Sequence, residues 1–260
     1  MPRRKVAKLR MKLVPEIFRE ELRRQFKVFI EPLMEAYVEP TRTGTRRGQP
    51  VGMSREKYLC AQAMALHSEI SELYPLSEIC AFICGSNTSV EMVRKWRTES
   101  HFKQVARQAA RAFASFIIDE ILRSENYYTH EKYHRVMILI ESLVLLPGFF
   151  LTDNKFIWVM RVLDDEIRHN PQDKENYSKL LNCITAYRDV LRIYMDMLQD
   201  NEREACEDEV DNIVRPILNK VDFLVEEAWK KDFITDDMAT AIGAIQMSLT
   251  FIMSYSKVVI

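Results

Sequence analysis

The chain has 260 residues, with 37 Lys and Arg against 38 Asp and Glu, and only 6 Gly and 9 Pro. This composition is typical of a soluble globular protein with much helix and few loops. Glycine is scarce and the sequence has no P-loop, G-x-G-x-x-G or G-x-S-x-G motif, which argues against an enzyme driven by a nucleotide.

The two parts of the chain carry opposite charge. Residues 1 to 112 contain 21 Lys and Arg and 12 Asp and Glu, a net charge of +9, whereas the remaining residues have a net charge of -10. Such a division indicates one part that faces nucleic acid and another that faces protein or water.

Five cysteines are present and none forms a C-x-x-C pair: Cys60, Cys80, Cys84, Cys183 and Cys206. We expect reduced thiols and therefore a cytoplasmic location, on the nucleoid if the source is bacterial. The basic N-terminus has no apolar run suited to a signal peptide. Residues 241 to 260 are apolar but interrupted by polar side chains, which favours a buried or oligomer-forming helix over a membrane span.

Residues 2 to 12 carry six cations and no acid, and Arg3 and Arg4 are among them. A basic arm of this kind strengthens binding to DNA phosphates, although a merely solvated tail has the same composition. A helix is predicted from Pro15 to about Val38, and Pro32 is expected to kink it or to end it early.

Residues 39 to 52 form a linker, because their Gly and Pro content prevents regular structure. Its cations are Arg42, Arg46 and Arg47, which in a DNA-binding protein reach a minor groove or follow the backbone; linkers with three arginines also occur in proteins that touch no nucleic acid. Ser54 is expected to cap the next helix, which we predict to run to Tyr74.

Residues 76 to 97 are predicted to form two short helices that meet at Gly85-Ser86-Asn87. The second helix follows a capping box, in which the Thr88 hydroxyl accepts the backbone N–H of Glu91 while the Glu91 carboxylate reaches back. This helix is therefore expected to start at Ser89.

The second short helix has two different faces. Val90, Val93 and Trp96 fall roughly on one apolar stripe, and the remaining face holds Glu91, Arg94, Lys95 and Arg97. A recognition helix needs such a division, because one side packs on its partner helix while the other enters a major groove.

At these residues the chain resembles the helix-turn-helix of bacterial and phage DNA-binding proteins, in particular a small-terminase-like and transposase-like group. The second helix of that group has the form T-V-x-x-W and is followed by a phenylalanine; Met92-Val93-Arg94-Lys95-Trp96 and Phe102 hold those places here. The resemblance covers residues 54 to 115 and implies an all-helical DNA-binding unit. Asn87 stands where the usual turn has a glycine, and Asn tolerates the left-handed conformation.

A long helix predicted from about residue 102 exposes Lys103, Arg107 and Arg111 over about three turns. Further helices are predicted at about 130 to 146, 154 to 169, 173 to 199, 203 to 230 and 236 to 258. No useful stretch alternates with a period of two, so we expect an all-α fold. We divide it into a basic arm, helix and linker (1–53), a helix-turn-helix unit (54–115) and an acidic multi-helix bundle for oligomerisation or partner docking (116–260).

Two patterns in the acidic part compete with the DNA interpretation. His130, Glu131 and His134 match H-E-x-x-H, which in zinc hydrolases binds the metal and activates water. The flanking residues lack the expected third ligand, since Met137 and Ile140 stand where a metzincin has glycine and histidine.

Two E-x-x-H pairs, Glu131 with His134 and Glu166 with His169, are also typical of di-iron helical bundles. They converge only if the helices at 130–146 and 154–169 form an antiparallel hairpin. The alternative is that these are polar residues at exposed helix ends, where such side chains suit the helix dipole.

The sequence therefore predicts a protein that binds double-stranded DNA, in a phage-type, mobile-element or regulatory role, with no cofactor and no catalytic residue. The expected contacts are Ser89, Glu91, Arg94, Lys95, Arg97, Lys103, Arg107, Arg42, Arg46, Arg47, Arg3 and Arg4. We expect a homo-oligomer, with the acidic bundle open to a protein partner and no membrane association. Two alternatives stay open: a helical scaffold that binds an acidic protein or RNA, and a metal-binding bundle.

Overall fold

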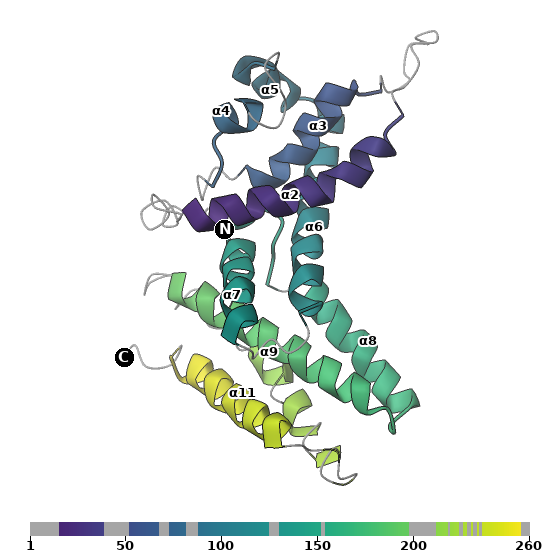
Figure 1. Ribbon diagram of the computed structural model, residues 1–260, viewed down its shortest axis with the longest axis vertical. Helices are drawn as coiled ribbons and strands as arrows, with labels where there is room; N and C mark the ends of the chain where they lie inside the picture. The colour runs from purple at the N-terminus through teal and green to yellow at the C-terminus, as the bar shows by residue number, and fades with distance from the viewer. Residues whose placement is uncertain are drawn as a thin grey trace. The chain divides into compact units, whose positions relative to one another are not determined.

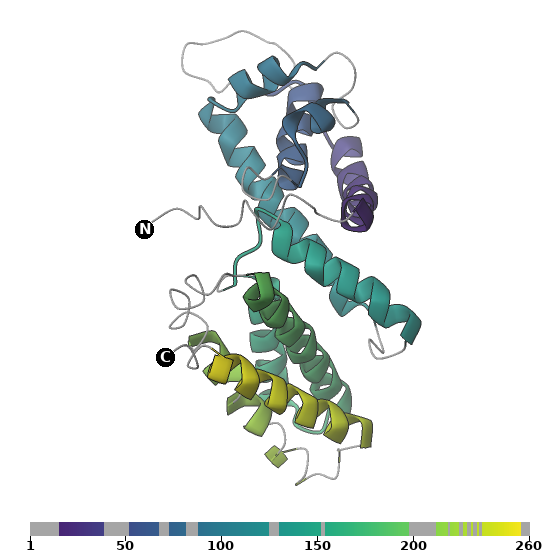
Figure 2. The ribbon, with the colours of Figure 1, turned by 90° about the vertical axis from the view of Figure 1, so that its left-hand side faces the viewer.

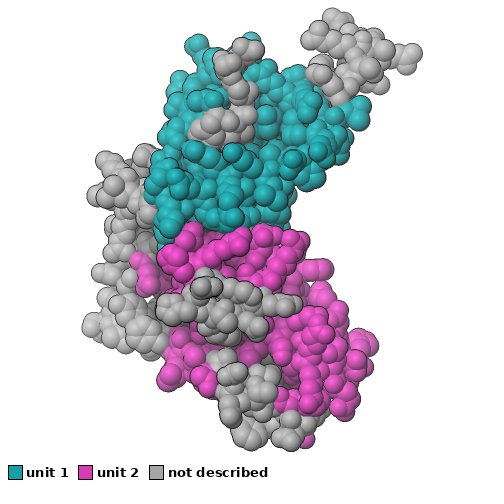
Figure 3. Space-filling model, viewed as in Figure 1, with its two compact units in different colours: residues 1–117, 141–149 teal, residues 118–140, 150–260 magenta. Residues whose placement is uncertain are grey.

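The computed structural model describes the backbone of residues 16–38, 52–67, 73–81, 88–124, 130–151, 154–197, 212–217, 219–223, 226–227, 230, 233 and 236–255. Every regular element in these ranges is a helix, so the predicted all-α fold is confirmed. The chain divides into two compact units, coloured separately in Figure 3. Unit 1 comprises residues 1–117 and 141–149, and unit 2 comprises residues 118–140 and 150–260.

Unit 1 contains α2 (Glu16–Glu35), α3 (Arg55–Ala63), the 3-10 helix η2 (Met64–Leu66), α4 (Leu76–Ile79), α5 (Val90–Trp96) and most of α6 (Ser100–Leu122). Aromatic rings pack between α2 and α6, the two helices labelled in Figure 1. The ring of Phe26 meets that of Phe113 edge-on at 5.5 Å, and Phe29 lies 5.2 Å from Phe113 and 5.7 Å from Phe116. Edge-on and tilted aromatic pairs of this kind add to the apolar burial that holds two helices together.

Pro32 lies inside α2 and does not end it, because the helix continues for one further turn to Glu35. The carbonyl of Pro32 accepts the Ala36 N–H at 3.1 Å. A proline has no N–H to donate to the carbonyl of Val28, four residues earlier, and Val28 lies on an exposed side of α2.

The predicted helix from residue 54 to Tyr74 is wrong at its end. Ser54 caps α3 as predicted, with its side chain accepting the Lys57 N–H at 3.3 Å, but α3 stops at Ala63 and continues only as η2. His67 is extended, with φ -90° and ψ 116°, and its Nδ1 lies 2.9 Å from the Tyr74 carbonyl oxygen. Apolar side chains on both sides of this break, including Leu66 and Leu73, are fully buried, so core packing outweighs the helical period.

Residues 141–149 belong to unit 1, and Gly148 among them lies against α6. At Gly148 a Cβ atom would lie 2.0 Å from the Ala110 carbonyl oxygen of α6. Only glycine allows two backbones to approach this closely.

Unit 2 contains part of α7 (His130–Leu145), with α8 (Lys155–His169), α9 (Lys174–Met197) and α11 (Asp236–Tyr255). Helices α8 and α11 both pack on α9, and Figures 1 and 2 show α9 beside each of them. Residues 212–217 and 219–223 are also helical, within the helix predicted at 203 to 230. Asn154 caps α8 by accepting the Ile157 N–H at 3.2 Å.

Within the described residues, none of the helices combines the length and the apolar character that crossing a membrane requires. The described part of α11 agrees with this, because Ile245 and Leu249 are fully buried against the rest of unit 2 while Met247 is exposed.

Candidate nucleic-acid interface

Helix α5 begins one residue later than predicted. Its N-cap is Ser89, whose side chain accepts the Met92 N–H at 3.2 Å, and the helix runs from Val90 to Trp96. Thr88 is buried and its hydroxyl donates to the Glu56 carboxylate of α3. The predicted Thr88 cap is therefore wrong: the Thr88 hydroxyl donates to a carboxylate of another helix, and the next residue, Ser89, caps α5.

The faces of α5 are divided as its sequence indicates. Val93 is fully buried, and Val90 and Trp96 are half-buried. The opposite side of the helix exposes Glu91, Met92, Arg94 and Lys95. This side is roughly 10 Å long, since each helical residue adds about 1.5 Å.

The first turn of α3 holds both ends of the α5 segment. Glu56 accepts the hydrogen bond from Thr88 before the helix, and the neighbouring Lys57 pairs with Glu99 after it. The Lys57 ammonium also lies 5.9 Å from the centre of the Trp96 ring. These contacts fix α5 on α3 although 31 or more residues separate the partners in sequence.

A tight turn joins α5 to α6. The N–H of Glu99 donates to the Trp96 carbonyl at 2.9 Å, and the N–H of Lys103 donates to the Glu99 carbonyl at 3.1 Å. The Trp96 and Phe102 rings are 6.4 Å apart and Phe102 is almost fully buried. The phenylalanine that follows the second helix thus contributes to the core at this corner.

Three exposed cations follow one another along α6, and we call them the α6 basic row: Lys103, Arg107 and Arg111. They recur every four residues, so they lie roughly 6 Å apart along one side of the helix. The sequence from residue 100 to residue 118 has no acidic residue. The opposite side of α6 is buried, with Phe113 and Ile117 fully enclosed.

The cations of α5 differ in their surroundings. Arg94 and Lys95 are exposed, and among the described residues neither takes part in an ion pair. Arg97 follows the helix as its C-cap and is half-buried. Ser89 is exposed at the N-terminus of α5, and its hydroxyl is engaged in the cap.

Several predicted contacts lie outside the described residues: Arg3, Arg4, Arg42, Arg46, Arg47 and the turn at 85–87. The predicted contacts on α5 and α6 belong to the same compact unit, unit 1. Sequence reasoning missed Glu56 and Lys57 as the residues that position α5. No local signal reveals them, because both partners come from distant parts of the chain.

Cys80, the residue that follows α4, behaves as an apolar side chain. Cys80 is buried, and its pKa is raised above the ordinary value by burial and, to a smaller degree, by the neighbouring Cys60 thiol. A buried thiol with a raised pKa is a poor nucleophile and a poor metal ligand.

The residues of the metal hypotheses lie in unit 2. Helix α7 begins at His130, so the H-E-x-x-H pattern occupies its first turns, and the side chains of His130 and Glu131 lie outside the described residues. His134, Glu166 and His169 are exposed. Across the side chains that the structure describes, there is no group of three or more His, Cys, Asp and Glu able to hold a metal ion.

No protein-family model matches this chain, and no curated protein and no solved structure is significantly similar to it.

Proposed function

We propose that the protein binds double-stranded DNA through α5 and α6 of unit 1. The observation that carries the proposal is a set of exposed cations on α5 and α6 of one unit. Arg94, Lys95, Lys103 and Arg107 form no ion pair among the described residues, and the exposed Arg111 continues the α6 basic row. Cations that are already paired within a protein gain little from a phosphate, whereas solvated ones release counterions from DNA when they bind.

In this proposal the two helices have different tasks. The α6 basic row follows the phosphates of one strand and supplies affinity that is independent of sequence. Helix α5 enters the major groove, where Arg94 and Lys95 reach phosphates or base edges and Ser89 and Glu91 lie near the bases. Arg97 supports the end of the helix or reaches a flanking phosphate.

The remaining predicted contacts add affinity for DNA. A basic arm with Arg3 and Arg4 and a linker with Arg42, Arg46 and Arg47 strengthen binding without reading sequence. The resemblance to small-terminase-like proteins implies an oligomer that delivers DNA to a motor or nuclease in the cytoplasm. A transcriptional regulator uses the same kind of unit on a paired operator.

The test is binding to a random-sequence duplex over a series of salt concentrations. We compare the wild type with Arg94→Ala/Lys95→Ala on α5, Lys103→Ala/Arg107→Ala/Arg111→Ala on α6, and a control. The control, Arg161→Ala/Arg192→Ala, removes two exposed arginines of unit 2 and so changes the net charge as the α5 variant does.

We expect the slope of log affinity against log salt to fall in magnitude by about 2 for the α5 variant and by about 3 for the α6 variant, because each lost phosphate contact removes about one unit. The control should keep the slope of the wild type. Equal slopes for all four proteins, or no binding by the wild type, would refute the proposed interface.

A further inference from the structure

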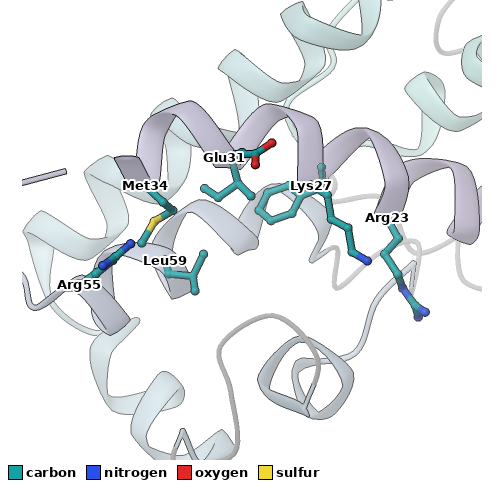
Figure 4. A pocket seen from close by; sticks show the side chains of 8 residues that line it. Arg23, Lys27, Glu31, Met34, Arg55 and Leu59 are labelled. Carbon is teal, nitrogen blue, oxygen red and sulfur yellow. The ribbon is translucent and has the colours of Figure 1, made fainter. Parts of the chain in front are cut away.

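A groove runs along α2 beside the first turns of α3, in unit 1 and apart from the α5 and α6 surface (Figure 4). Its volume is about 410 Å³ and it is open to solvent. Its lining residues are Arg23, Phe26, Lys27, Ile30, Glu31, Met34, Arg55 and Leu59. We call it the α2–α3 groove.

The floor of the groove is apolar. Phe26, Ile30 and Met34 recur every four residues and form one row on α2, and Leu59 adds to it from α3. Phe26 is almost fully buried, whereas Ile30, Met34 and Leu59 remain only half-buried. A row of this kind is roughly 12 Å long, about the length of two helical turns.

The rim of the groove is basic. Figure 4 shows Arg23 and Lys27 toward one end of the groove and Arg55 toward the other, beside Met34. Glu31 is the one acid in the lining. Lys27 and Arg55 are exposed and make no ion pair with any described residue, so both are available to a partner with negative charge.

We propose that the α2–α3 groove is a docking site for an acidic, amphipathic α-helix of a partner protein. An amphipathic helix places apolar residues at i, i+3, i+4 and i+7 into such a floor. Acidic residues at both ends of its apolar stripe then meet Lys27 and Arg23 at one end of the groove and Arg55 at the other. Met34, with its flexible and polarizable side chain, adapts to the shape of the incoming residue.

Other occupants fit the groove less well. Single-stranded nucleic acid stacks its bases on exposed aromatic rings, but the one aromatic residue of the lining, Phe26, is 2% exposed. A small ligand in a typical site is enclosed over most of its surface, whereas this groove is partly open to solvent. A partner helix bound in the groove covers the side of the groove that is open to solvent.

The probe is a fluorescent peptide of about 16 residues with leucines at i, i+3, i+4 and i+7 and glutamates at both ends of that face. A second peptide has lysine in place of each glutamate. Binding to the 260-residue chain is followed by anisotropy at moderate salt, and circular dichroism confirms that each variant is folded. We expect the acidic peptide to bind and the lysine peptide to bind at least about tenfold more weakly.

Two variants test the groove itself. Ile30→Glu changes the floor, and its matched control is Val28→Glu, because Val28 lies on the same helix, is 56% exposed and does not line the groove. Lys27→Glu/Arg55→Glu changes only exposed rim residues, so it is informative even if the floor variant is poorly folded. We expect both groove variants to weaken binding of the acidic peptide by about tenfold or more, and the control to change it by less than about twofold.

Several results would overturn the proposal: no binding of the acidic peptide, equal binding of the lysine peptide, or an equal loss in Val28→Glu. Displacement of the peptide by a single-stranded oligonucleotide whose own binding is lost in Lys27→Glu/Arg55→Glu would make nucleic acid the occupant. Peptide binding in the groove and DNA binding at α5 and α6 use different residues. Arg94→Ala/Lys95→Ala should bind the peptide normally, and the groove variants should bind duplex DNA normally.

Discussion

Cys183 shows how burial sets the chemistry of a single residue. The side chain is fully buried in unit 2, and its Sγ donates to the Phe156 carbonyl oxygen at 3.7 Å. Burial, opposed by nearby Lys220, raises the pKa of this thiol from 9.0 to about 12. The folded state keeps the thiol proton over a range of pH in which the unfolded state loses it, so this residue favours the unfolded state as pH rises above 9.

Ionisation of Cys183 in the unfolded state should lower the free energy of unfolding of the wild type between about pH 7 and about pH 10. We expect this fall to be smaller in Cys183→Ala than in the wild type by about 1 kcal/mol, because one pKa unit corresponds to about 1.4 kcal/mol. Urea unfolding at both pH values measures the free energy of unfolding of each protein. The packing lost in Cys183→Ala lowers that free energy equally at the two pH values, so it cancels when the change with pH is compared between the two proteins. An equal fall in both proteins would show that the thiol ionises alike in the folded and unfolded states.

Packing between elements depends on how closely their backbones approach. Gly148 lies against α6, where an added Cβ would be 2.0 Å from the Ala110 carbonyl oxygen. Gly243 on α11 is a matched contrast, because a Cβ there meets no atom within 4 Å. The same substitution should therefore have opposite effects at the two positions.

We expect Gly148→Ala to lower the free energy of unfolding by about 1–3 kcal/mol or more, since helix backbone has to move to make room. Gly243→Ala should raise it by about 0.5–1 kcal/mol, because alanine is the better helix former. Thermal and urea unfolding of both variants test this. A Gly148→Ala protein as stable as the wild type would mean that residues 141–149 do not pack on α6 as described.

The organisation of the whole molecule is not a simple sequence of domains. Unit 1 includes residues 141–149, which return to it after 118–140. Leu143 and Leu146 in this segment are buried, and each buried leucine contributes roughly 1.5–3 kcal/mol of apolar burial. The predicted boundary at residue 115 leaves this segment out of the unit that contains α5.

A fragment of residues 1–117 should therefore lose the cooperative thermal transition that a fragment of residues 1–149 retains. Circular dichroism melting curves of the two fragments test the expectation. A cooperative transition of equal midpoint in the shorter fragment would show that residues 141–149 add nothing to the stability of unit 1.

The sequence by itself determined the properties that depend on neighbours within a few residues. The helical class follows from the apolar periodicity and from scarce Gly and Pro. The Ser54 cap and the buried side of α5 at Val93 follow in the same way, because a cap joins residues three apart and a helical face repeats every three or four. The exposed cations of the candidate site, such as Arg94 and Lys103, lie on faces that the same periodicity predicts to be exposed.

Only the tertiary structure decided what depends on residues far apart in the chain. The Thr88 hydroxyl donates to Glu56 of α3, and Ser89 caps α5 in its place. Lys57 of the same turn holds the far end of α5 through Glu99. Packing between distant residues also accounts for three further features: the early end of α3, the position of residues 141–149 in unit 1, and the α2–α3 groove. Each arises where side chains or backbones from different elements compete for space and partners, and local propensity is too weak to overrule that packing.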